Sequence, residues 1–292
     1  FLPAATNVAS ARNKGLELSL TYRGEKGDWD YDITGNLSII RNEVTGLGEG
    51  GQPINTGGVF GAGNDFSAYT DIGLPMAVFY GYETAGIFQT DEEAIANTAQ
   101  PEAQAGDVIF VDQNGDGILD ENDKTVIGNP HPDFTYGVTA NVKWKNFDAS
   151  IFIQGSHGND LFNGIFRYDL NTTNLPVSAL ERWTGEGSTN EHPRISHVDA
   201  NQNNRVSDRF VEDGSFLRVK NLQIGYTLPA RIQEKMDIGK FRVYVSASNL
   251  LTFTNYSGLD PEIGSRGTLE IGIDRGFYPV SRNFIAGVNV TF

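Results

Sequence analysis

The chain contains several segments in which apolar and polar residues alternate with a period of two. In residues 282–292 only Ile285 breaks the alternation, and the apolar positions are Phe284, Ala286, Val288, Val290 and Phe292. Such alternation is typical of a β-strand with one apolar face. A strand of about 9 to 11 residues crosses a bilayer when it is tilted. On its own, this segment fits either a transmembrane strand or a strand of a soluble sandwich.

A second segment, residues 134–144, carries a further feature of transmembrane strands. Its apolar positions have aromatic side chains at both ends and aliphatic ones between them: Phe134, Tyr136, Val138, Ala140, Val142 and Trp144. In membrane barrels the aromatic residues lie in the two interfacial girdles and the aliphatic residues lie at the hydrocarbon midplane. This segment is therefore patterned for a membrane along its whole length.

Further alternating segments bring the total to about seven predicted strands. They are residues 15–23, 28–39, 147–156, 222–228 and 241–247. The predicted fold class is all-β, with these antiparallel strands forming part of a large transmembrane β-barrel. The strand at residues 282–292 is expected to close the barrel by pairing with the first strand, because lipid leaves no partner for unpaired backbone groups.

The connections between the predicted strands alternate in length. Short connections follow the first, third and fifth strands, whereas long polar stretches occupy about residues 41–133, 157–215 and 253–281. Membrane barrels have short periplasmic turns and longer extracellular loops. We therefore expect the three long stretches to be extracellular loops, and Phe292 to lie in the periplasm.

Composition agrees with this fold and excludes some functions. The chain has 292 residues, 34 glycines and 11% aromatic residues, and its mean hydropathy is −0.32. The net charge of −15 argues against nucleic acid as a partner, because phosphate would be repelled. Cysteine is absent, which rules out disulfides and thiol chemistry in this chain. Residues near Phe1 do not resemble a signal peptide, so we expect any export signal to lie upstream or to have been removed.

Residues 112–123 match the ligand pattern of an EF-hand calcium loop. Oxygen ligands fall at the required loop positions, with Gly117 at position 6: Asp112, Asn114, Asp116, the carbonyl of Ile118, Asp120 and Asp123. Calcium takes six to eight oxygen ligands, so this set forms a nearly complete shell. Position 12 is Asp instead of the usual Glu, which shortens the reach of the last ligand.

The residues before this loop do not support a calcium sensor. Residues 107–111 read as a strand and not as the amphipathic helix that precedes a sensor loop. We therefore expect a structural calcium site that braces the first long loop, with a weak affinity of about 10⁻⁴ to 10⁻³ M. An Asx-rich turn without metal is the alternative.

Other chemistry is not predicted. The chain has no serine elbow, P-loop or dinucleotide fingerprint, and its four histidines lack metal-binding spacing. We expect the protein not to be an enzyme. Aromatic side chains in the long stretches offer surfaces for stacking on sugars or peptides, although such residues more often pack a loop: Phe166, Tyr168, Trp183, Tyr256, Phe277 and Tyr278.

Several stretches taken together resemble a known family. They are NKGLEL (residues 13–18), FYGY (79–82), GIFQT (86–90), GDVIFVDQNGDG (106–117), IGNPHP (127–132), EDGSFLRVKNL (212–222) and the last strand. In this order they look like the C-terminal part of SusC/RagA-type TonB-dependent outer-membrane transporters of Bacteroidota. The resemblance covers nearly the whole chain.

The resemblance implies a 22-stranded barrel with a plug in the lumen, located in the cell outer membrane. It also implies import of oligosaccharides or peptides, powered through TonB, with a SusD-like lipoprotein as a lid over the extracellular mouth. The TonB box and the plug would lie before Phe1. Residues 1–292 are therefore expected to be a single region, the C-terminal segment of a TonB-dependent receptor barrel.

The sequence leaves two alternatives open. The first is a soluble, calcium-stabilised surface adhesin or glycan-binding β module, built as a sandwich. The second is a barrel-embedded hydrolase, for which the sequence offers no particular catalytic residue. The identity of the cargo is not determined by the sequence, because one barrel scaffold serves many cargoes.

Overall fold

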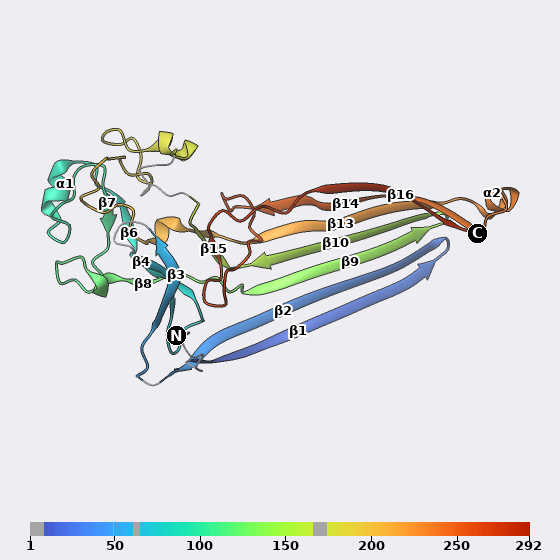
Figure 1. Ribbon diagram of the computed structural model, residues 1–292, viewed down its shortest axis with the longest axis horizontal. Helices are drawn as coiled ribbons and strands as arrows, with labels where there is room; N and C mark the ends of the chain where they lie inside the picture. The colour runs from blue at the N-terminus through green and yellow to red at the C-terminus, as the bar shows by residue number, and fades with distance from the viewer. Residues whose placement is uncertain (1–8, 49, 61–64, 166–173) are drawn as a thin grey trace, which may run out of the picture.

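The computed structural model describes residues 9–48, 50–60, 65–165 and 174–292. Seven long strands lie side by side in one antiparallel sheet (Figure 1). In their order across the sheet they are β1 (Ala9–Lys26), β2 (Trp29–Leu47), β9 (Phe134–Trp144), β10 (Phe147–His157), β13 (Phe216–Thr227), β14 (Lys240–Thr254) and β16 (Asn283–Thr291). The seven strands predicted from the alternation are thereby confirmed.

Most of the strands are longer than the alternation predicted, whereas β9 has the predicted bounds and β16 is slightly shorter. β1 and β2 have 18 and 19 residues, and β13 begins at Phe216 instead of Leu222. The missed part of β13 lies beyond a bulge, where the register against β14 shifts between Val219 and Asn221. A bulge inserts one extra residue, which reverses the phase of the alternation and hides the continuation of the strand.

The strand register sorts the side chains onto two different faces. One row that crosses all seven strands is entirely apolar: Tyr22, Ile33, Ala140, Ile151, Leu222, Ala247 and Phe284. The adjacent row points to the other face and is polar except for one member: Thr21, Thr34, Thr139, Phe152, Asn221, Ser248 and Asn283. We call these the outer face and the inner face.

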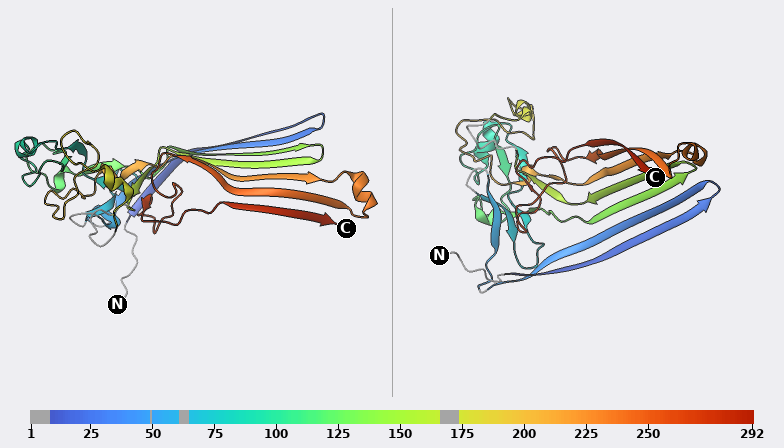
Figure 2. Two further views of the ribbon diagram at one scale, coloured as in Figure 1. Left: turned by 90° about the horizontal axis from the view of Figure 1, so that it is seen from above. Right: turned by 45° about the vertical axis from the view of Figure 1, so that its right-hand side comes forward.

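Large apolar side chains on the outer face are uncovered in the described part of the chain. Leu20 is 66% exposed, Val288 56% and Phe284 71%. Figure 2 shows that the smaller elements lie at the ends of the sheet, almost all of them at one end, and leave most of both its faces bare. Among the described residues no second sheet packs on the apolar face of the seven strands, so this arrangement differs from the sandwich of the first alternative.

An aromatic belt crosses the outer face close to one end of the sheet. Trp29, Trp144, Phe147 and Tyr226 are successive neighbours across four strands, with ring centroids 5.6, 6.2 and 4.7 Å apart. Aromatic rings at this position are typical of a membrane interface.

None of the helices in the described residues is both long and apolar enough to span a membrane.

Short connections lie at the end of the sheet nearest to this belt, which we call the turn end. β1 and β2 are joined through Gly27 (φ 62°), and β9 and β10 through Lys145 (φ 53°). Positive φ values are required by the tight turns whose twist matches that of a hairpin. The connection from β13 to β14 contains a short helix, α2 (Ala230–Lys235), which the sequence did not predict. The chain also ends there (Figure 1).

Long connections lie at the opposite end, the loop end. We name them loop I (residues 48–133), loop II (158–215) and loop III (255–282). All three contain regular elements, of which the sequence predicted only the strand near residues 107–111. Loop I contains β3 (Ile54–Phe60), β4 (Asp65–Thr70), β5 (Val78–Gly81), β6 (Thr84–Ile87), α1 (Asp91–Ala96), β7 (Val108–Phe110), the 3₁₀ helix Glu121–Asp123 and β8 (Thr125–Gly128).

Loops II and III also contain regular elements. They are β11 (Asp160–Asn163), the 3₁₀ helices Val177–Glu181 and Asp208–Phe210, β12 (Val211–Asp213) and, in loop III, β15 (Ile273–Asp274). β12, β11 and β15 form one small sheet, in which β15 runs parallel to β11. Loops II and III therefore share backbone pairing.

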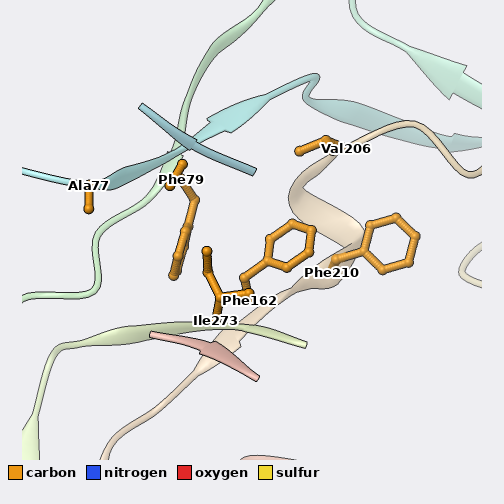
Figure 3. Close-up of a cluster of buried hydrophobic side chains, with 7 residues drawn as sticks. Ala77, Phe79, Phe162, Val206, Phe210 and Ile273 are labelled. Carbon is orange, nitrogen blue, oxygen red and sulfur yellow. The ribbon is translucent and has the colours of Figure 1, made fainter. Parts of the chain in front are cut away.

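All three loops contribute to one hydrophobic core, which we call the loop core (Figure 3). Its buried members are Ala68, Ala77 and Phe79 from loop I, Phe162, Val206 and Phe210 from loop II, and Ile273 from loop III. The ring of Phe162 lies between those of Phe79 and Phe210, with centroids 5.8 Å from each. A core built from three separate segments holds them together as one body, because each segment buries apolar side chains against the other two.

Substitution of Val138 by Arg should prevent assembly of the full-length protein in the membrane. Val138 lies on the outer face, and an Arg at the bilayer midplane costs about 2 to 4 kcal/mol. The readout is the amount of folded, heat-modifiable protein in isolated outer membranes. The control is Thr139→Arg on the inner face, which should assemble normally. Equal tolerance of the two substitutions would contradict the assignment of the faces.

Candidate functional site

Buried polar contacts at the loop end of the sheet join loop I to loop II. Asp107 of loop I is fully buried, and its carboxylate accepts hydrogen bonds from Arg194 Nε at 2.7 Å and Nη2 at 3.1 Å. Asn203 Nδ2 donates to the same carboxylate at 2.8 Å. A buried charge needs such pairing, so these contacts fix loop II against loop I.

Backbone groups join the same two loops. The amide of Tyr82 donates to the carbonyl of Val206 at 3.0 Å, and the amide of Asp208 donates to the carbonyl of Tyr82 at 3.1 Å. The Tyr82 ring packs against Phe110 in a second cluster of buried apolar residues, with the ring centroids 5.7 Å apart. Loops I and II therefore form one rigid structure above the sheet.

The connection between the loops and the sheet wall is centred on Arg218 of β13. Arg218 lies opposite Gln154 of β10 and Thr252 of β14, so all three side chains point to the inner face. Its residue exposure is only 2%. An arginine this deeply buried on a polar barrel wall must have partners that cover it.

Those partners come from β14 and from loop III. Arg218 Nε donates to Thr252 Oγ1 at 2.9 Å. Nη1 donates to Glu262 Oε2 at 2.8 Å, and Nη2 donates to Asp260 Oδ1 at 2.5 Å. The guanidinium thus uses three nitrogens for three different side chains, a geometry that its planar fork allows. Loop III is folded back over the inner face at this point.

Two more inner-face side chains complete this group, which we call the Arg218 cluster. Lys220 Nζ donates to both carboxylate oxygens of Glu262 at 2.9 and 2.8 Å, and Gln154 Nε2 donates to Glu262 Oε1 at 3.2 Å. The cluster contains two cations and two carboxylates, so its charges balance. Ionic side chains can be buried when their charges balance and their hydrogen bonds are satisfied.

Asp260 shows the electrostatic effect of the cluster. Burial acts to raise the pKa of its carboxyl, but the hydrogen bond from Arg218 and the amides of Glu262 and Val280 outweigh it, so the pKa is lowered. Those two amides donate to Asp260 at 2.9 and 3.0 Å. Asp260 therefore remains charged at neutral pH and ties two parts of loop III to the wall.

A buried pair fixes the base of loop III. Tyr256 donates its hydroxyl to Asp274 Oδ2 at 2.7 Å, and both residues are buried. Burial, followed by the adjacent carboxylate, raises the pKa of Tyr256, so the hydroxyl keeps its proton and acts as the donor.

Of the aromatic residues predicted to line the loops, Tyr256 packs inside, whereas Tyr278 is 92% exposed. Phe166 and Tyr168 lie outside the described residues.

Sequence reasoning did not single out the Arg218 cluster. The stretch that contains Arg218 contributes only to the family resemblance. The available signal was the local alternation of Leu217 and Val219 with Arg218 and Lys220, which marks a strand with charged inner positions. Their shared acidic partner, Glu262, lies 42 residues after Lys220 and 44 residues after Arg218, so no local sequence pattern indicates the contact.

In the predicted calcium loop, the carboxylates turn inward and accept hydrogen bonds from backbone amides. Asp112 accepts from Gly115 at 2.7 Å and from Gly117 at 2.8 Å, and Asp116 accepts from Ile118 at 2.8 Å. Asn114 accepts from Asp116 at 2.9 Å. These bonds curl the chain tightly around its own polar side chains.

The end of this loop is buried. Asp123 has no exposed surface and accepts from Gln113 at 3.0 Å and from Asp120 at 2.7 Å, which brings both ends of the loop together. The amide of Gly117 makes the largest contribution to a lowered pKa of Asp112. No group of three His, Cys, Asp or Glu side chains arranged around a metal position occurs among the described residues. The strand predicted just before the loop is confirmed as β7.

No family model matches the chain. It is 32% identical over 98% of its length to TonB-dependent receptor P3 of Formosa agariphila, and 27% identical over 98% to TonB-dependent receptor SusC of Bacteroides thetaiotaomicron. Among solved structures, it matches the RagAB peptide importer in its closed-closed state with 25% identity and a TM-score of 0.75, covering 98% of this chain and 30% of that one.

A two-faced sheet with folded loops at one end is part of the wall and mouth of a transmembrane β-barrel. The chain is homologous to the TonB-dependent receptors of the SusC/RagA type. It spans 29% and 27% of the length of the two curated relatives. The resemblance inferred from the sequence motifs is confirmed.

Substitution of Phe162 by Ala should loosen all three loops and leave the sheet assembled. Phe162 is fully buried at the centre of the loop core, and loss of a buried Phe side chain costs about 3 to 5 kcal/mol. Limited proteolysis of the purified full-length protein should then cut loops I, II and III faster than in the wild type. Tyr278→Ala is the control, because that exposed ring supports no core. Cleavage confined to loop II would contradict a shared core.

Proposed function

We propose that this chain forms part of the barrel wall and the extracellular mouth of a TonB-dependent importer in the cell outer membrane. The observation that carries the proposal is the division of the sheet into an apolar outer face and a polar inner face across all seven strands. An apolar face is required for contact with lipid, and a polar face suits a water-filled or plugged lumen. Homology to TonB-dependent receptors supports TonB as the source of energy for import.

The cargo in this proposal is an oligosaccharide or a peptide. One relative is named SusC, and another is a peptide importer. A SusD-like surface lipoprotein would cover the mouth, above the rigid structure made by the three loops. Contact with the TonB complex would be made by an N-terminal region outside this chain. The proposal includes no catalytic step.

Uptake in living cells tests this function. Cells that lack the gene should lose uptake of either a fluorescent oligosaccharide mixture or a fluorescent peptide mixture, and the full-length gene should restore it. Deletion of TonB should abolish the same uptake, because active transport through the barrel depends on it. The Thr139→Arg variant serves as an assembled control for expression. Uptake that depends on the gene but continues without TonB would contradict the proposal.

We also propose that residues 112–123 bind calcium at a structural site. Asp112, Asn114, Asp116, the Ile118 carbonyl, Asp120 and Asp123 would hold the ion, and the ion would supply charge neutralisation to the loop. The chemistry of these oxygen ligands suits a hard cation. Asp123 is buried and accepts a hydrogen bond from Gln113 near the start of the loop. This supports a position for its carboxylate beside the other proposed ligands. The site would brace loop I.

Calcium should protect this loop from proteolysis. With the affinity expected for such sites, 10 mM calcium stabilises the bound form by about 1 to 3 kcal/mol, so cleavage within residues 112–123 should slow about 10- to 100-fold relative to EDTA. Asp112→Asn combined with Asp123→Asn should remove the effect. Glu121→Gln is the matched control, because Glu121 is not at a ligand position. Identical cleavage with calcium and with EDTA in the wild type would exclude the site.

A further inference from the structure

Loop III is attached at two independent places. The first is the Arg218 cluster, where residues 260–262 and 280 are held to the inner face of the wall. The second is the loop core, where Ile273 is buried and β15 pairs with β11. There the amide of Phe162 donates to the Gly272 carbonyl at 2.9 Å, and the amide of Gly164 donates to the Asp274 carbonyl at 2.8 Å.

Further contacts connect loop III with loops I and II. Thr56 Oγ1 donates to the Leu269 carbonyl at 2.6 Å. The amide of Ser257 and its hydroxyl donate to the Glu212 carboxylate at 2.7 and 2.8 Å. A segment with so many buried and charge-assisted contacts has a high cost of local opening, unlike the weakly packed segments that act as lids.

We propose that loop III is a fixed part of the inner wall at the mouth of the importer, and that Arg218 is the positioning residue that sets its place. This inference rests on the proposed function, and it distinguishes a fixed part of the mouth from the parts of the receptor that move. Loop III narrows the mouth permanently and presents its exposed surface, including Tyr278, to cargo. The movements that admit cargo then occur in other parts of the receptor.

Arginine is needed at this position because of geometry as well as charge. Its three nitrogens reach Thr252 on the neighbouring strand and two carboxylates of loop III at once. A lysine has one nitrogen and is a point charge on a flexible stem, so it does not hold three partners in fixed directions. Arg218→Lys therefore separates a positioning role from a purely electrostatic one.

The position of loop III is measured by the distance between two spin labels on the full-length receptor in detergent. Gly46, near the loop end of β2, and Gly267 in loop III are suitable label sites. At both, an added Cβ meets no heavy atom within 4 Å, and neither has a positive φ. The chain has no cysteine of its own, so Gly46→Cys and Gly267→Cys introduce unique attachment points in it.

The wild-type background should give a single narrow distance peak. Arg218→Met and Arg218→Lys should both lose this peak and give a broad distribution. Arg12→Met is the matched control, because Arg12 pairs with Glu43 at 2.6 Å in a half-exposed ion pair, and it should keep the narrow peak. If the Arg218 variants do not assemble, Asp260→Asn and Glu262→Gln remove the partners in loop III and leave β13 unchanged, with the same broadening expected.

Two results would overturn the proposal. One is a broad or two-peaked distribution in the wild type, which would make loop III mobile. The other is survival of the narrow peak in either Arg218 variant, or in both loop variants, which would remove the positioning role. The distances are measured without any transport, so failure here is distinct from failure of the uptake experiment that tests the proposed function.

Discussion

Backbone hydrogen bonding between neighbouring strands is the constraint on which the rest of the structure depends. In lipid, every amide and carbonyl group must find a partner within the protein, and a continuous antiparallel sheet provides these partners. Because side chains alternate along each strand, one register places Tyr22, Ile33 and Ala140 together on the outer face and Thr21, Thr34 and Thr139 on the inner face. A slip of one residue would exchange the two faces of a strand. The register of the strands therefore determines which side chains face the lipid.

The sheet also organises the loops. Its strands bring the ends of three long segments to one place, and Phe79, Phe162 and Ile273 can then form a core that no single segment could build. Arg218 connects this assembly to the wall through a balanced set of charges. The mouth is thus held in two ways, by apolar packing among the loops and by ionic contacts with the inner face. This arrangement explains how long polar connections adopt a defined shape at the edge of a membrane.

The sequence made the strands predictable wherever alternation was uninterrupted, as in residues 134–144, because their period is a local property. It did not reveal the first half of β13, where the bulge beside Lys220 changes the phase. Nor did it reveal the folded loops, since their strands are as short as Ile273–Asp274 and their partners lie far apart in the chain. The oxygen ligands of residues 112–123 were visible from spacing, and their binding of calcium stays a prediction. The Arg218 cluster required the register and the fold of loop III together.

The assignment of one face of the sheet to lipid and of the other to the lumen can be measured in the membrane. It is tested most directly by placing a nitroxide spin label at each position of β9 in turn, in the full-length receptor reconstituted in bilayers. Collisions with oxygen, which concentrates in lipid, and with a water-soluble nickel complex are then measured. We expect oxygen accessibility that oscillates with a period of two and peaks at Val138, Ala140 and Val142, with nickel accessibility or burial at Gly137, Thr139 and Asn141. Uniform accessibility along the strand, or an oscillation with the opposite phase, would contradict this assignment.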